Sequence, residues 1–188
     1  MSVGAAIERL LHQLRDDLMI KAVLLTASLL TGLISAGVQA QTPMQIAGDP
    51  DALFTSPDPQ LNANKHVVYR IIRDLLEAGQ WDKADELLSE DYVQHNPNAQ
   101  SGRAAVVDYF TNVLKVKPRP IPARLNMKII AVIAEGDLVT VLYPRTVKDP
   151  NAPDGVYMTT WYDTWRINGG KAVEHWDPAL LGESPDLR

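Results

Sequence analysis

The spacing of apolar residues divides the chain beyond Asn62 into a helical part followed by a strand part. In the first stretch, apolar residues recur in adjacent pairs every four positions: Val67, Val68, Ile71, Ile72, Leu75 and Leu76. This spacing places them on one face of a helix, which the 62–64 segment can cap and Gly79 can end. A shorter helix is expected over 82–88, with Ala84, Leu87 and Leu88 inward.

A third helix is expected over about 101–116. It would bury Val106, Val107, Phe110, Val113 and Leu114. Prolines at 118, 120 and 122 prevent its continuation, because proline lacks the amide donor that a helix interior needs. Between the second and third helices, the Pro and Asn residues of 92–98 predict irregular backbone.

Past the prolines the apolar period changes from helical to two. Segments 125–134 and 138–147 are rich in Ile and Val, and Glu135-Gly136-Asp137 joins them as a hairpin. Segments 156–167 and 171–177 predict a second hairpin across Asn168-Gly169-Gly170. Helices followed by strands predict an α+β domain, with the helices packed on one face of an antiparallel sheet.

The segment ahead of Asn62 has a different character. Lys21 precedes an uncharged, largely apolar run over 22–40 that closes with Val38-Gln39-Ala40, the three parts of a secretory signal. We expect cleavage after Ala40 and a periplasmic or secreted product. The alternative, a membrane anchor, needs roughly 20 strongly apolar residues, whereas strong hydrophobicity ends near Ile34 here. No stable anchor is therefore expected after cleavage.

Domain boundaries follow from these segments. Residues 1–40 are an N-terminal extension with a cleavable signal, and the acidic pair Asp16-Asp17 suggests that translation begins at Met19. Residues 41–61 contain four prolines and read as a flexible linker. The folded domain is expected over 62–188.

Composition narrows the function classes. The chain has 188 residues, a net charge of −5 and no cysteine. Without a cluster of basic residues, nucleic acid is not expected as a partner. The lack of cysteine excludes disulfides, thiolate metal sites and a cysteine nucleophile.

Three strings resemble a known family when taken together. They are the segment 87–97, which ends in Gln94-His95-Asn96-Pro97, the pair Gly102-Arg103, and the late string Glu174-His175-Trp176-Asp177. This combination, spread over residues 62–178, resembles SnoaL-like polyketide cyclases of the nuclear-transport-factor-two-like superfamily. The resemblance implies a cone-shaped, curved antiparallel sheet packed on about three helices and enclosing a pocket. It also implies a homodimer that joins through the convex face of the sheet.

The family's chemistry is varied, so the resemblance transfers a fold more firmly than a reaction. Its members include cyclases, isomerases, dehydratases and epoxide hydrolases, and others bind ligands without known chemistry. We expect either a cofactor-independent cyclase, isomerase or lyase using acid–base chemistry on a small apolar carbonyl compound, or a non-catalytic exported module. That module would bind a small apolar or aromatic molecule, or a partner.

Acid–base chemistry next to a carbonyl needs a base and a donor for the enolate oxygen. Asp163 is the first candidate, because strand alternation puts it on one face with Trp161 and Trp165. The opposite parity would turn Asp163 to solvent and Arg166 inward. His95 is the second candidate, as a donor or proton relay, although a lone histidine can equally cap a helix or tie down a loop.

Other residues are expected to form the pocket wall. His175 and Asp177 share one strand face and Glu174 and Trp176 the other, and parity does not decide which face lines the cavity. The expected substrate-binding residues are Tyr92, Asn96, Tyr143, Trp161, Trp165, Trp176 and Asp177. Because no closely spaced metal-binding motif or phosphate-cradling loop is present, neither a metal nor a cofactor is expected.

Overall fold

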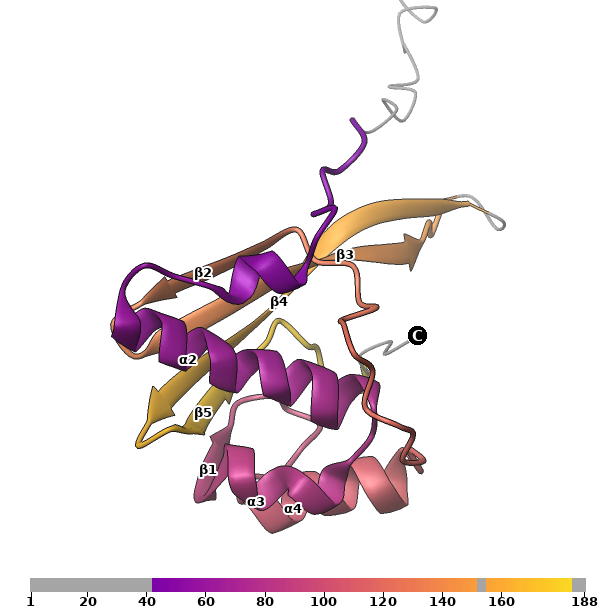
Figure 1. Cartoon of the computed structure of the whole chain (residues 1–188). Coiled ribbons are helices and arrows are strands. Elements are labelled where there is room, and N and C mark those ends of the chain that lie inside the picture. Colours follow the sequence, from indigo (N-terminus) through magenta and orange to yellow (C-terminus); the bar gives the residue numbers. More distant parts are fainter. Residues whose placement is uncertain (1–41, 152–154, 184–188) are drawn as a thin grey trace, which may run out of the picture. The chain divides into compact units, whose positions relative to one another are not determined.

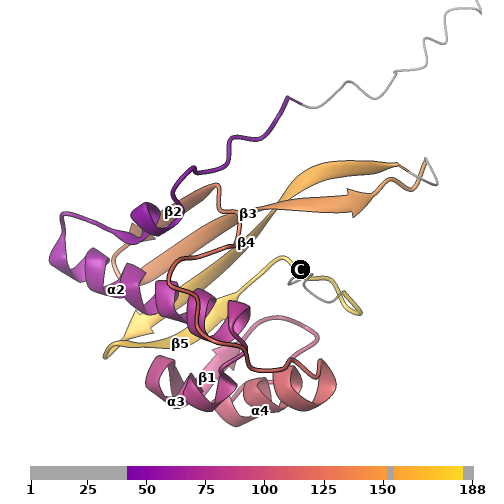
Figure 2. The same ribbon diagram turned by 45° about the vertical axis from the view of Figure 1, so that its right-hand side comes forward.

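The computed structural model describes residues 42–151 and 155–183. Its helices precede most of its strands, as Figures 1 and 2 show. The helical elements are η1 (Asp51–Phe54), α2 (Pro59–Arg70), η2 (Ile71–Glu77), η3 (Trp81–Lys83), α3 (Ala84–Leu87), α4 (Arg103–Asp108) and η4 (Tyr109–Val113). The strands are β1 (Leu88–Gln94), β2 (Ala131–Glu135), β3 (Leu138–Lys148), β4 (Val156–Asn168) and β5 (Lys171–Trp176).

Five strands form one curved, open sheet in the order β1-β5-β4-β3-β2. The pairs β2–β3, β3–β4 and β4–β5 are antiparallel, whereas β1 runs parallel to β5. The α+β class is therefore confirmed, with a mixed rather than wholly antiparallel sheet. The prediction of irregular backbone over 92–98 was wrong for residues 92–94, because the Asn and Pro signals belong to the turn that follows β1.

The first helix lies across one face of the sheet (Figure 1). It begins at Pro59, where the Asp58 carboxylate accepts a hydrogen bond from the Leu61 amide at 2.9 Å. Asn64, expected in the cap, is instead buried within the helix and donates to the Gly136 carbonyl at 3.0 Å. This bond attaches the helix to the β2–β3 hairpin.

The core lies between this helix and the sheet. Val68, Ile72 and Leu75 are fully buried, and they belong to the same apolar cluster as Val139 and Val141 of β3. The continuation of α2 as the π-helical η2 does not remove its apolar stripe from this interface.

The end of η2 depends on a glycine. Gly79 has a φ of +67°, a backbone conformation that side chains rarely adopt. A Cβ atom at this position would also meet the Lys117 carbonyl at 2.9 Å. Glycine is thus required both by the turn and by the close approach of residue 117.

The third helix differs from its prediction. Its α-helical part is α4, and residues 109–113 continue as a π-helix, whose i→i+5 bonds change which residues share a face. Val106 is buried as predicted, but Val113 is 62% exposed. The prediction that Val113 faces the core was therefore wrong. Residues 125–130, predicted as strand, precede β2 rather than forming part of it.

The packed structure extends ahead of residue 62. Phe54 is buried and packs edge-on against Tyr69, with ring centroids 5.4 Å apart. The Ala47 amide donates to the Ile129 carbonyl at 2.9 Å. The segment expected to be a flexible linker thus supplies an aromatic residue to the core. The predicted signal and its cleavage after Ala40 lie outside the described residues.

None of the described helices is long and apolar enough to span a membrane.

Candidate functional site

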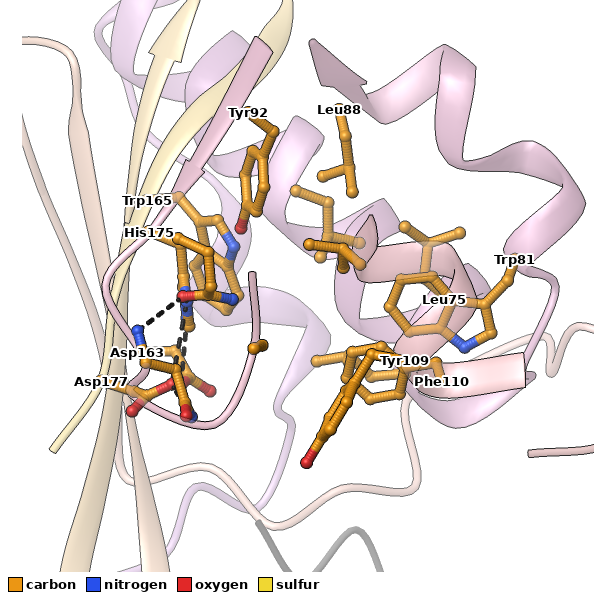
Figure 3. A pocket seen from close by; sticks show the side chains of 16 residues that line it. Leu75, Trp81, Leu88, Tyr92, Tyr109, Phe110, Asp163, Trp165, His175 and Asp177 are labelled. Carbon is orange, nitrogen blue, oxygen red and sulfur yellow. Dashed lines mark hydrogen bonds and ion pairs between the residues drawn. The ribbon is translucent and has the colours of Figure 1, made fainter. Parts of the chain in front are cut away.

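Two hollows meet at Asp163 on the concave side of the sheet. The inner cavity, of about 70 Å³, lies between the sheet and the helices. Its wall is mostly apolar, with aliphatic side chains and the aromatic rings of Trp81, Tyr92, Phe110 and Trp165 among them (Figure 3). The outer cleft, of about 780 Å³, lies between the 119–128 segment and strands β3 and β4. Asp163 lines both, so a group bound in either hollow can reach its carboxylate.

Strand alternation explains how the polar residues gather. Within β4, residues 161, 163 and 165 point to the same side, and Trp165 pairs with His175 across the antiparallel β4–β5 ladder. Gln94 of β1 pairs with His175 from the other side. Adjacent positions on three neighbouring strands therefore project toward one point of the concave face.

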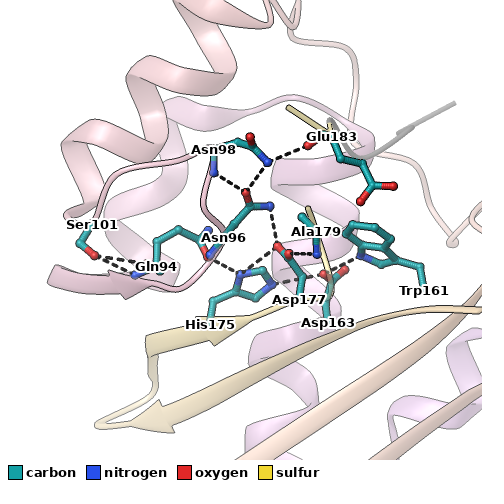
Figure 4. Close-up of polar contacts among 10 residues, drawn as sticks. All are labelled: Gln94, Asn96, Asn98, Ser101, Trp161, Asp163, His175, Asp177, Ala179 and Glu183. Atoms are coloured by element: carbon teal, nitrogen blue, oxygen red, sulfur yellow. Dashed lines mark hydrogen bonds and ion pairs between the residues drawn. The ribbon is translucent and has the colours of Figure 1, made fainter. Parts of the chain in front are cut away.

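A connected set of hydrogen bonds joins these side chains (Figure 4). His175 Nε2 lies 3.3 Å from Asp163 Oδ1, and His175 Nδ1 lies 2.8 Å from Gln94 Oε1. The Trp161 indole donates to Asp163 Oδ1 at 3.1 Å. His175 is only 6% exposed. Its ring is therefore held on both nitrogens in a largely dry environment.

Asp177 completes the cluster from the end of β5. Its Oδ2 accepts a hydrogen bond from the Asn96 amide group at 2.8 Å and its Oδ1 accepts one from the Ala179 backbone at 2.9 Å. Oδ2 also lies 3.8 Å from His175 Nδ1. Asp177 thus places a second carboxylate beside the histidine while being fixed by its own donors.

Two buried tyrosines border the cluster. Burial, and secondarily the negative charges of Asp163 and Asp177, raise the pKa of Tyr92 above its ordinary value of 10.0. Burial also raises the pKa of Tyr143, and the nearby charge of Asp163 adds to the rise. Within the described part of the chain, the buried Tyr143 hydroxyl has no partner in hydrogen-bond geometry, Asp163 included. Both phenols therefore stay protonated near neutral pH.

The same cluster offers ligand atoms for a metal ion. One atom each from Asp163, His175 and Asp177 lies within 4.8 Å of the other two. Both oxygens of Asp177 already accept hydrogen bonds, however. The prediction that no metal is used stays a prediction.

His95 is not part of this cluster. The alternation that turns Gln94 and Asn96 inward turns His95 to the convex face. There its Nε2 contacts Glu174 Oε1 at 2.8 Å, and its ring stacks on Trp176 with the centroids 5.1 Å apart. Neither His95 nor Trp176 lines the inner cavity or the outer cleft. The structure therefore does not bring these two predicted site residues together with Asp163.

The remaining predicted residues do lie around the hollows. Tyr92, Asn96, Trp165 and Asp177 line the inner cavity, and Tyr143 and Trp161 line the outer cleft. The question of which β5 face is inward is settled in favour of His175 and Asp177. Gln94 was missed. Strand alternation places residues 92 and 94 on the same side as Asn96, and this pattern could have identified Gln94 as a site residue.

The chain was compared with known proteins at the level of family and of solved structure. The model of the SnoaL-like domain matches residues 68–175. No curated protein matches the sequence closely enough to count as a relative.

Solved structures that resemble the chain have low sequence identity to it. One is a protein from a Jannaschia species assigned as a SnoaL-like polyketide cyclase, 18% identical, covering 66% of this chain and 91% of its own, with a TM-score of 0.46. A protein assigned as a polyketide cyclase from Acidithiobacillus ferrooxidans is 16% identical, covers 61% and 86%, and has a TM-score of 0.45. A nuclear-transport-factor-two-like protein of unknown function from Burkholderia pseudomallei is 19% identical, covers 64% and 92%, and has a TM-score of 0.43.

The family match covers more than half of the chain and includes β1, β4 and the residues of β5 up to His175. The chain belongs to the SnoaL-like domain family.

Proposed function

We propose that this SnoaL-like protein is a cofactor-independent acid–base enzyme of the cyclase, isomerase or lyase type, acting on a small apolar carbonyl compound. The observation that carries the proposal is the buried contact between Asp163 and His175, placed where the inner cavity and the outer cleft meet. A carboxylate among tryptophans is costly to bury unless it is paired or used. Here it is paired and also accessible to a ligand.

The two hollows suggest how a substrate binds. The outer cleft has a volume of about 780 Å³. Small-molecule sites occupy roughly 300 to 1,000 Å³, so a whole ligand fits there. The inner cavity is too small for a whole ligand, but its mostly apolar wall suits an apolar substituent. The body of the substrate would then lie in the outer cleft, against Trp161 and Tyr143, with its reacting carbon beside Asp163.

The chemistry follows from the groups at that point. Asp163 accepts a proton from the carbon next to the substrate carbonyl, and the electron pair of the broken C–H bond becomes an enolate. The Tyr143 hydroxyl, a donor without a partner among the described residues, stabilises the enolate oxygen. In an isomerase, the proton returns from Asp163 to another atom of the substrate. In a cyclase, the enolate carbon forms a bond to a second carbonyl carbon, the electron pair of that carbonyl's π bond moves to its oxygen, and this oxygen takes the proton from Asp163.

A non-catalytic ligand-binding role is the second candidate. It is favoured by the hydrogen bonds within the protein, because Asp177 and His175 both have protein partners. Such a network can simply hold the strands together and shape a pocket.

Proton exchange separates the two candidates. Wild-type protein and Asp163→Asn are incubated in D2O with a set of small cyclic ketones, and deuterium uptake next to the carbonyl is followed by mass spectrometry. Binding of the neutral apolar dye N-phenyl-1-naphthylamine is measured in parallel. Enzyme-dependent uptake that Asp163→Asn loses while dye binding persists supports catalysis. Dye binding by both proteins with uptake no faster than in buffer supports the binding module.

Two further proposals concern the protein's context. The signal-like segment over 22–40 supports export, which fractionation and mass measurement of the mature protein would test.

On the convex face, Ile133 is 59% and Tyr162 45% exposed. Apolar surface of this kind supports dimerisation through that face. Light scattering of wild type and Tyr162→Lys tests it: a wild-type monomer would refute the dimer.

A further inference from the structure

The side chain of Gln94 lies against the imidazole ring of His175. It ends β1, the edge strand that runs parallel to β5, and its side chain points to the concave face with His175. Its Oε1 atom has two nitrogen neighbours: the Asn96 backbone N–H, which donates to it at 3.1 Å, and His175 Nδ1 at 2.8 Å. Neither Gln94 nor its amide orientation has a role in the acid–base steps described above.

The Asn96 amide fixes the orientation of the Gln94 side chain. A backbone N–H only donates, so the Gln94 atom facing it must be the oxygen rather than the NH2 group. That same oxygen faces His175 Nδ1. An oxygen of an amide only accepts, and His175 Nδ1 must therefore carry a hydrogen.

With a hydrogen on Nδ1 of a neutral ring, His175 Nε2 faces an Asp163 oxygen that is also an acceptor. In a neutral histidine protonated at Nδ1, Nε2 has a lone pair and no hydrogen. Nε2 lies 3.3 Å from Asp163 Oδ1, which is also an acceptor when the carboxyl is ionised. Two lone pairs facing each other in a buried site are unfavourable, so a proton must lie between them.

We propose that Gln94 is a positioning residue that holds His175 protonated at Nδ1 and thereby loads one additional proton onto the Asp163–His175 pair. The proton lies either on Asp163 or on His175 Nε2. The catalytic role of this proton rests on the proposed function. The number of protons held by the Asp163–His175 pair follows from the hydrogen bonds alone. The ionisable groups around the ring are Asp163 on β4, Asp177 after β5 and Tyr92 on β1; the helices contribute Tyr109 to the same cavity.

The additional proton defines the order of proton transfers. In the resting pair, Asp163 Oδ1, His175 Nδ1 and His175 Nε2 hold two protons in total. When the substrate C–H bond breaks, the proton shared between Asp163 and His175 lies on Nε2, and the substrate proton forms an O–H bond on Asp163. The electron pair stays on the substrate as the enolate, and the pair then holds three protons. Asp177, 3.8 Å from Nδ1, offsets the resulting positive charge of the imidazolium. The return of that proton to the substrate restores the resting state.

The distribution of protons on His175 is measured by nitrogen-15 NMR of protein labelled at histidine, in wild type, Gln94→Met and Gln94→Glu. His175→Gln identifies the signals. Gln94→Met removes the acceptor at similar volume, and the ring is then expected to move its hydrogen to Nε2 and donate to ionised Asp163. Gln94→Glu keeps an acceptor, so Nδ1–H is expected to persist. Gln60→Met, a change on the exposed start of α2, is the matched control and should leave the His175 signals unshifted.

Three results decide the inference. A hydrogen on Nδ1 in wild type and Gln94→Glu that is lost in Gln94→Met supports it. A wild-type His175 without a hydrogen on Nδ1 overturns it, even if Gln94→Met does not fold. Retention of Nδ1–H in folded Gln94→Met also overturns it, since Gln94 would not be the controlling group. The spectra require no substrate, so a protein with the expected protonation but no deuterium exchange would refute the proposed function and not this inference.

Discussion

His175 and His95 lie on opposite faces of the sheet at almost the same place in the fold. Their backbones are joined directly, because the His95 amide donates to the His175 carbonyl at 3.1 Å. His175 is 6% exposed and lies among Asp163, Asp177 and Gln94. The His95 side chain is 43% exposed and contacts Glu174 and Trp176. Strand parity alone has given two neighbouring histidines different surroundings.

The two polar networks differ in their burial rather than in the types of residue they contain. The convex network links His95, Glu174, Arg166 and Asp137 in water, where ion pairs contribute little. The concave network contains a similar set of groups, but water is largely excluded from it. Its hydrogen bonds must therefore be satisfied internally, and this requirement fixes proton positions there and not on the convex face.

The largest expected difference between the two faces is in catalysis. Asp163→Asn should lower the rate of deuterium exchange into a responsive ketone by on the order of 10² to 10⁴, because positioned acid–base groups contribute rate factors of that size. Asp137→Asn, which removes a convex-side carboxylate paired with Arg166, should change the rate less than about twofold. Equal losses in the two variants would contradict the assignment of the concave face as the reactive one.

Stability should separate the histidines next. His175→Leu leaves Asp163 and Asp177 close together in a buried site without their shared partner, at a cost of about 3 kcal/mol in the free energy of unfolding. His95→Leu breaks only an exposed pair and should cost less than about 1 kcal/mol. Urea denaturation followed by tryptophan fluorescence measures both. A larger loss for His95→Leu would reverse the comparison.

Two tyrosines provide a smaller contrast. Tyr143→Phe removes a buried hydroxyl that has no partner among the described residues. The free energy of unfolding should therefore rise slightly or stay within about 1 kcal/mol of wild type. Exchange should nevertheless fall roughly tenfold, through loss of the oxyanion donor. Tyr162→Phe, on the convex face, should leave both quantities unchanged. A Tyr143→Phe variant that exchanges at the wild-type rate would exclude this residue as the oxyanion donor.

The smallest expected effect is a pH dependence from the convex face. His95, followed by Arg166, lowers the pKa of Glu174 below its ordinary value of 4.5. A lowered folded-state pKa contributes stability that is present above the unfolded value and is lost as the pH falls through the folded value. Glu174→Gln should therefore lower Tm near neutral pH, and the difference from wild type should shrink below about pH 4.5. A difference that grows on acidification would contradict the sign of this shift.

The sequence predicted the fold well where the apolar period was regular. The pairs from Val67 to Leu76 gave the long helix, and alternation in the second hairpin gave β4 and β5 with Asp163 inward. It failed where local signals competed. Pro97 and its neighbouring asparagines made residues 92–94 look irregular, so parity was not applied to β1. His95 was therefore expected at the site, whereas His175 was not selected because strand parity left the inward face of 171–177 undecided.

Other features depend on contacts between distant segments and leave no local pattern. Packing of Phe54 on Tyr69 is one example, and the parallel pairing of β1 with β5 is another. The Gln94 contact with His175 joins residues 81 positions apart in the chain. Only the assembled sheet shows that these side chains meet.

We propose that the proton-handling histidine of this protein is His175 and not His95. Exchange of ketone protons for deuterium, measured side by side for His175→Gln and His95→Gln, tests it most directly. We predict a loss of at least about tenfold for His175→Gln and a rate within about twofold of wild type for His95→Gln. Loss of exchange in His95→Gln with full activity in His175→Gln would contradict the claim.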